Sequence, residues 1–73
     1  MKRYITSNPK IMSGKPVISG TRIPISRIIF LLSDGYDYEE IQEEYPHVSQ
    51  ETLKTAVREF IKNINQYYYA SQV

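Results

Sequence analysis

Side chains able to carry catalysis are scarce in this sequence of 73 residues. The chain has no cysteine and one histidine, His47, which follows a proline in an expected turn. Nucleophilic catalysis needs a nucleophile with a base within hydrogen-bond reach. No cysteine and no serine-rich loop accompanies His47, so we predict that this histidine is a surface or capping residue and that the chain is not an enzyme.

Metal and phosphate chemistry have weak support in the sequence. Four glutamates form two pairs one helical turn apart, Glu39 with Glu43 and Glu40 with Glu44. Such pairs can hold Mg²⁺, but a solvated acidic face is the more common outcome and the one that we expect. The glycines near Lys15 do not have the spacing of a P-loop. The sequence therefore predicts no metal and no other cofactor.

Charge is segregated along the chain although the net charge is only +1. Residues 1–27 contain six Lys or Arg and no acid, whereas residues 28–51 contain seven Asp or Glu and no Lys or Arg. Two interpretations stay open: solvated faces with pairing between the two halves, or two surfaces that bind different partners.

Length and hydropathy predict one small cytoplasmic domain covering residues 1–73. The longest apolar run, Ile28 to Leu32, is far shorter than the ~20 residues of a membrane span. A chain of this size buries only roughly 60% of its unfolded surface, so we expect it to gain stability as a homodimer.

Residues 1–25 are predicted to form basic N-terminal strands and turns, because three of the four prolines fall there. Tyr4–Ile5 is expected to be a short strand. The runs 16–18 and 23–25 favour a loose β-hairpin or two edge strands, since proline cannot donate to a central ladder. Gly20 is expected to take a positive φ in the turn between them.

Residues 26–69 are predicted to form a three-helix unit with a C-terminal extension. Ser26 is expected to cap a helix over 27–33, with Ile25 and Phe30 as its hydrophobic staple. Asp37 and Glu40 form a capping box for a second helix that ends near Glu44, before a proline. Ser49 caps the third, whose apolar residues recur every three or four positions as far as Tyr68. The short turn 45–48 between the last two helices is typical of a helix-turn-helix protein.

The segment from Pro9 to Ile25, P-K-I-M-S-G-K-P-V-I-S-G-T-R-I-P-I, closely resembles the signature of a family of short prokaryotic proteins, domain of unknown function family four-thirty-three. The segments 31–35, 39–41 and 45–48 continue the likeness, which covers roughly residues 4–62. The resemblance implies a homeodomain-like helix-turn-helix core. It also implies an antitoxin of a type II toxin–antitoxin system, whose partner is often a PIN-like nuclease toxin.

The signature residues are expected to have structural roles first; they are Gly14, Lys15, Pro16, Gly20, Thr21, Arg22 and Pro24. Thr21 is expected to bond to local backbone. For Arg22 we favour an ion pair with Glu40 or Glu44, because its own half of the chain has no acid. The alternative is that Arg22 faces a phosphate or an acidic site on a toxin.

Two binding surfaces are predicted on the third helix. Side chains able to contact operator DNA are Gln50, Lys54, Thr55 and Arg58. The acidic second helix opposes DNA docking, so we expect DNA binding only by a dimer. The partner-binding surface is predicted to be the apolar end of the chain, Phe60, Ile61, Ile64, Tyr67, Tyr68 and Tyr69. Two further alternatives remain: a protein interaction or dimerisation module that never binds DNA, or an apolar end that folds back to complete the monomer core.

Overall fold

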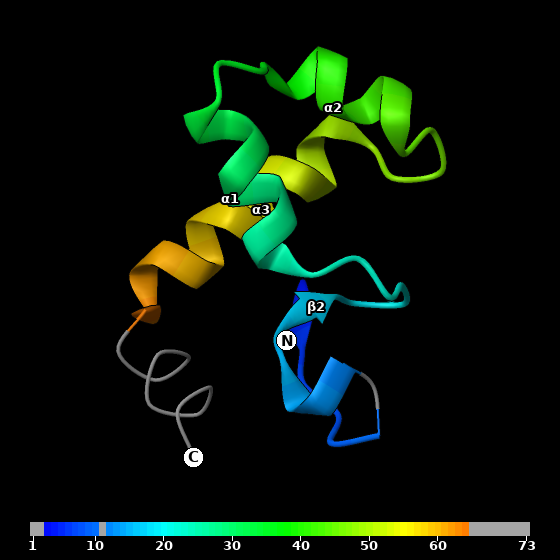
Figure 1. The fold of residues 1–73 in the computed structure, drawn as a ribbon, viewed down its shortest axis with the longest axis vertical. Helices are drawn as coiled ribbons and strands as arrows, with labels where there is room; N and C mark the ends of the chain where they lie inside the picture. Colours follow the sequence, from blue (N-terminus) through cyan, green and yellow to red (C-terminus); the bar gives the residue numbers. More distant parts are fainter. Residues whose placement is uncertain (1–2, 11, 65–73) are drawn as a thin grey trace.

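A computed structural model describes residues 3–10 and 12–64 of the chain. Two short strands, β1 (Ile5–Thr6) and β2 (Val17–Ile18), flank a single 3₁₀ turn at Met12–Gly14. Three helices follow: α1 (Ile25–Ser33), α2 (Tyr38–Glu44) and α3 (Gln50–Lys62). The strands lie at one end of the molecule, α2 lies at the other, and α1 and α3 cross between them (Figure 1). The predicted fold class, mainly α with a short N-terminal hairpin and a three-helix core, is confirmed.

The two strands pair antiparallel, with Ile5 opposite Ile18 and Thr6 opposite Val17. The prediction that 16–18 would pair mainly with 23–25 is therefore only partly right. That pairing is an isolated bridge between Val17 and Pro24, supported by backbone bonds from Ile18 N to Ile23 O and from Ile25 N to Pro16 O. Pro24 has no N–H to extend the ladder, so the regular strand partner of β2 is β1.

Helix α1 begins earlier than expected, and its start corrects two predictions. Pro24 is the N-cap residue and no side chain caps this helix, so Ser26 lies inside the first turn. Ile25 is then the first helical residue and is buried in the core. Phe30 remains 56% exposed, so it forms no staple with Ile25. Proline fixes the φ angle of the N-cap, which lets the helix start without a side-chain cap.

The caps predicted for the other two helices are confirmed. The Asp37 carboxylate accepts from Glu40 N at 2.8 Å, and the Glu40 carboxylate accepts from Asp37 N at 3.1 Å. Ser49 Oγ accepts from Thr52 N at 3.1 Å. Each bond satisfies an N–H that a helix leaves without an internal partner, and together they fix both sides of the connection between α2 and α3.

Helix α3 ends sooner than the apolar periodicity predicted. Its C-cap is Asn63, whose side-chain amide donates to Glu59 O at 3.0 Å. The helix is therefore interrupted at Asn63, because an amide that bonds locally to the backbone competes with the helical pattern. Tyr67, Tyr68 and Tyr69 lie outside the described residues.

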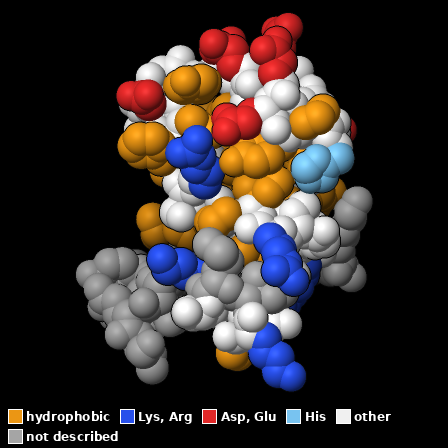
Figure 2. Space-filling model, turned by 45° about the vertical axis from the view of Figure 1, so that its right-hand side comes forward, with side chains coloured by type: hydrophobic (Ala, Val, Ile, Leu, Met, Phe, Trp, Pro, Cys, Tyr) orange, Lys and Arg blue, Asp and Glu red, His pale blue; other side chains and the backbone are white. Residues whose placement is uncertain are grey.

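The core is one cluster of apolar side chains drawn from both strands, all three helices and the connections between them. Its largest fully buried members are Ile18, Ile25, Ile28, Ile41 and Leu53. Acidic side chains gather at the end of the molecule formed by α2, and Lys and Arg lie toward the hairpin end (Figure 2). The charge segregation of the sequence is thus a segregation in space.

Candidate functional site

An open groove between α2 and α3 brings the predicted DNA-binding and partner-binding residues together. We call it the basic groove; its lining residues are Tyr38, Lys54, Val57, Arg58, Ile61 and Lys62, around about 460 Å³ of space. Val57 is buried and forms part of its apolar lining, whereas Lys54, Arg58 and Lys62 are exposed. These cations stand four residues apart on α3, so they form one row along the helix.

The predicted DNA-binding residues divide by exposure. Lys54 and Arg58 are exposed and line the basic groove. Gln50 and Thr55 are half-buried. The Lys54 ammonium lies 5.7 Å from the centroid of the Tyr38 ring, a cation–π contact that orients it along the groove. Two of the four residues are therefore placed as cations on an accessible surface, while the other two are less accessible.

The predicted partner-binding residues divide in the same way. Ile61 is 60% exposed and Ile64 is 48% exposed. Phe60, by contrast, is half-buried and packs against the core, which corrects its assignment to an open surface. We call Ile61, in the last turn of α3, and Ile64, just beyond the C-cap Asn63, the apolar edge of α3. Exposed apolar side chains at the end of a small domain are suited to binding another protein.

Two of the signature residues, Gly20 and Thr21, build the turn beyond β2. Thr21 Oγ1 donates to Ile18 O at 2.7 Å and accepts from Ile23 N at 3.0 Å, which closes the turn. Gly20 has a φ of 78° and Gly14 a φ of 82°, so both take the left-handed conformation that favours glycine. Pro16 is buried, whereas Lys15 and Arg22 are exposed. The structural role of the Gly20–Thr21 turn is confirmed.

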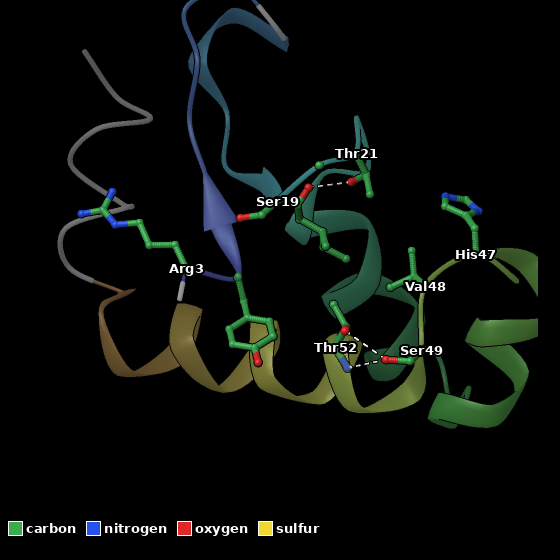
Figure 3. Close-up of a pocket in the computed structure, with 10 residues that line it drawn as sticks. Arg3, Ser19, Thr21, His47, Val48, Ser49 and Thr52 are labelled. Carbon is green, nitrogen blue, oxygen red and sulfur yellow. Dashed lines mark hydrogen bonds between the residues drawn. The ribbon is translucent and has the colours of Figure 1, made fainter. Parts of the chain in front are cut away.

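A second cavity, of about 420 Å³, lies between this turn and the connection that precedes α3. Arg3 and His47 stand at opposite sides of it, with Thr21, Ser49 and Thr52 between them (Figure 3). Three of its hydroxyls are engaged in local bonds: Thr21 closes the turn, and Ser49 and Thr52 cap α3. The fourth, Ser19 Oγ, is buried and has no hydrogen-bond partner among the described residues. His47 is exposed. Among the described residues that line the cavity, no hydroxyl is hydrogen-bonded to a basic side chain.

The ion pair expected for Arg22 is formed by another arginine. Arg27 Nη2 lies 3.5 Å from Glu44 Oε1, and the Glu40 carboxylate is engaged in the α2 cap. The Tyr45 hydroxyl first, and then the Glu44 carboxylate, raise the pKa of the Arg27 guanidinium. Arg27 forms the ion pair with Glu44 because it lies on α1, which packs directly against α2. Arg22 lies in an exposed loop before α1.

The role of Tyr38 was not predicted from the sequence, whereas Lys62 was expected, with Arg58 and Arg22, among the cations that could inhibit a toxin. The spacing of Lys54, Arg58 and Lys62 could have revealed the basic row, but the aromatic wall comes from α2 and requires the packing of two helices. Among residues 3–10 and 12–64, no group of three acidic, His or Cys side chains is placed to hold a metal ion. No helix in the same part of the chain has both the length and the apolar composition to cross a bilayer.

Comparisons with known proteins agree with this architecture. The chain is 31% identical over 55 residues to the uncharacterized protein y4eO of Sinorhizobium fredii, and the match covers 75% of this chain and 25% of that protein. The chain thus spans a quarter of the length of this curated relative.

The structure also resembles the crystal structure of a DUF433 member protein from Anabaena variabilis, with a TM-score of 0.78 and 25% identity. The similarity covers 93% of this chain and 67% of the other. Residues 5–58 match the family described as "Protein of unknown function (DUF433)". Because that match spans both strands and most of the three helices, this chain belongs to the DUF433 family.

Proposed function

We propose that this chain is a non-enzymatic cytoplasmic antitoxin of a prokaryotic type II toxin–antitoxin system, which binds and neutralises a PIN-like nuclease toxin. The observation that carries the proposal is the apolar edge of α3, Ile61 and Ile64, beside the cations Arg58 and Lys62. The toxin class follows from the family resemblance of the signature.

The chemistry of this surface suits such a partner. Metal-dependent nucleases hold Mg²⁺ with carboxylates, so the mouth of their active site is acidic. Exposed cations beside an apolar anchor complement a surface of that kind. Arg58 and Lys62 would supply the charge and Ile64 the apolar contact. Neutralisation would then follow from occupying the nuclease site.

Replacing Ile64 with Asp is expected to weaken toxin binding by roughly 30-fold, about 2 kcal/mol, because it places a charge in the centre of the contact. Calorimetry with the nuclease encoded beside this chain measures the dissociation constant. A second assay measures the RNA cleavage that remains at a fixed concentration of antitoxin. Phe30→Asp is the matched control, since Phe30 is also an exposed apolar side chain but lies on α1. Full binding by Ile64→Asp, or an equal loss in Phe30→Asp, would contradict the proposed surface.

Operator binding by a dimer is a second candidate function. It is favoured by the cations that the structure leaves exposed: Lys54 and Arg58 on α3, and Arg3, Lys10, Lys15 and Arg22 at the hairpin end. The acidic face of α2 repels phosphates and limits the orientation in which DNA can approach. The alternative is a protein-binding module that never contacts DNA.

Replacing Lys54 or Arg58 with Ala is expected to weaken DNA binding across sequences and to reduce the salt slope by about one unit per residue. The measurement is a titration of operator DNA at several salt concentrations. Lys15→Ala and Arg22→Ala are the matched control variants, since they remove exposed cations from the hairpin end instead of from α3. If only the hairpin pair lowers the slope, α3 is not the contacting element. An absence of any shift at ~50 mM salt, with or without the toxin, would remove this candidate.

A further inference from the structure

The basic groove combines apolar and positively charged walls around one open space. Its apolar lining includes the ring of Tyr38, the first residue of α2, and the exposed side chain of Ile61. Its charged lining is the basic row of α3, Lys54, Arg58 and Lys62. None of the described residues that line the groove is acidic.

The charges of the basic row are not neutralised within residues 3–10 and 12–64. Arg27 with Glu44 is the one ion pair within 4.0 Å in this part of the chain. The Lys54 ammonium instead lies 5.7 Å from the centroid of the Tyr38 ring, which keeps the charge beside an apolar surface. The row is therefore available to attract acidic groups of another molecule.

The spacing of the basic row matches that of carboxylates on a second helix. Lys54, Arg58 and Lys62 stand four residues apart on α3, and each step is about 6 Å along the helix axis. Carboxylates at every fourth position of another helix repeat at the same distance. A helix that crosses α3 at a small angle can thus meet more than one of the three cations at once.

The lining of the groove favours a helix over an extended strand or a nucleic acid. None of the described lining residues lies on a strand, so an extended peptide would find no sheet edge to pair with. A helix bonds its own backbone and presents an apolar stripe. Single-stranded nucleic acid binds through bases stacked on several aromatic rings, whereas Tyr38 is the one aromatic side chain among the described lining residues.

We propose that the basic groove receives an acidic amphipathic helix of the toxin, which borders the mouth of the nuclease site. Carboxylates of that helix pair with Lys54, Arg58 and Lys62, and an apolar residue between them packs against Tyr38 and Ile61. The pairing rests on the proposed function, because its partner is the same toxin. It adds Tyr38 and Lys54 to the binding surface and assigns the kind of segment that they bind.

The groove and the apolar edge then form one continuous contact. Ile61 belongs to both, since it lines the groove and is exposed beside Ile64. Arg58 and Lys62 keep the role that they have in the proposed function. The helix of the toxin extends the same contact along α3 as far as Lys54, where the start of α2 closes the groove.

Charge reversal at Lys54 tests the pairing by calorimetry with the nuclease encoded beside this chain. Lys54→Glu is expected to weaken binding about tenfold at ~50 mM NaCl, because it sets like charges against each other, and the loss should shrink at ~500 mM NaCl. Lys10→Glu is the matched control, since it makes the same change of charge at an exposed site between the two strands. It should change binding by less than about twofold. Circular dichroism confirms that both variants are folded.

Photo-cross-linking identifies the segment that enters the groove. The natural chain contains no cysteine, so Lys54→Cys can carry a single benzophenone maleimide label. In the complex with the nuclease, mass spectrometry is expected to find this label joined to a helix with carboxylates at every fourth position. Lys10→Cys with the same label should give no cross-link to the nuclease. A cross-link from position 54 to another kind of segment, or to single-stranded oligouridine in preference to the nuclease, would overturn the proposal.

The two variants of α3 and its edge separate failure of the groove from failure of the proposed function. If Ile64→Asp weakens nuclease binding and Lys54→Glu does not, the groove lies outside the contact and the proposed function stands. An equal loss in Lys54→Glu and Lys10→Glu would also exclude the groove, since only overall charge would then matter. A wild-type chain that does not bind the nuclease would remove the proposed function, and the groove proposal with it.

Discussion

Replacing Ile41 with Ala is expected to lower the free energy of unfolding by about 2–5 kcal/mol, through lost burial and the cavity that remains. Ile41 is the single buried residue of α2 and is 0% exposed. Folded domains have only about 5–15 kcal/mol of stability in total, and a chain this short is expected near the lower end. The variant should therefore lose a large share of its stability, and α2 should detach from α1 and α3.

Urea unfolding followed by circular dichroism measures this loss. Glu43→Ala is the matched control on the same helix, since Glu43 is exposed and its truncation should change stability by less than about 0.5 kcal/mol. A change below about 1 kcal/mol for Ile41→Ala would mean that α2 is not held by this contact.

Replacing Gly20 with Val is expected to destabilise the hairpin end by ~1 kcal/mol or more. Gly20 has a φ of 78°, and a β-branched side chain in this left-handed region is strained. The reduced entropy of the unfolded chain offsets part of the strain, by about 0.4–1 kcal/mol. Each kcal/mol lost should lower the melting temperature by about 4–8 °C.

The space around Gly20 makes this a clean test of backbone strain. A Cβ built at Gly20 would have no atom within 4 Å beyond its chain neighbours, so the strain comes from the backbone conformation and not from a clash of Cβ with packed neighbours. Gly20→Asn is the matched control, because Asn tolerates the left-handed conformation, and it should melt closer to wild type than Gly20→Val. If Val and Asn melt together at the wild-type temperature, the turn has no structural need for glycine and its role shifts to binding.

Local signals in the sequence were enough to predict most of the helical half of the fold. Asp37 with Glu40 and Ser49 with Thr52 form the expected caps, because caps involve residues only a few positions apart. The family resemblance carried by residues 9–25 was likewise confirmed. The start of α1 was misplaced because Pro24 replaces a capping side chain, and the end of α3 because Asn63 interrupts a regular apolar pattern.

The sequence by itself determined the caps of α2 and α3, the glycine turn, the number of helices and the separation of acidic from basic segments, since each depends on neighbouring residues. Only the tertiary structure decided that Val17 and Ile18 pair with Thr6 and Ile5, that Glu44 pairs with Arg27, and that Tyr38 faces Lys54. These contacts join residues more than ten positions apart. Their geometry depends on how α1, α2 and α3 pack around the shared core, which local propensity does not encode.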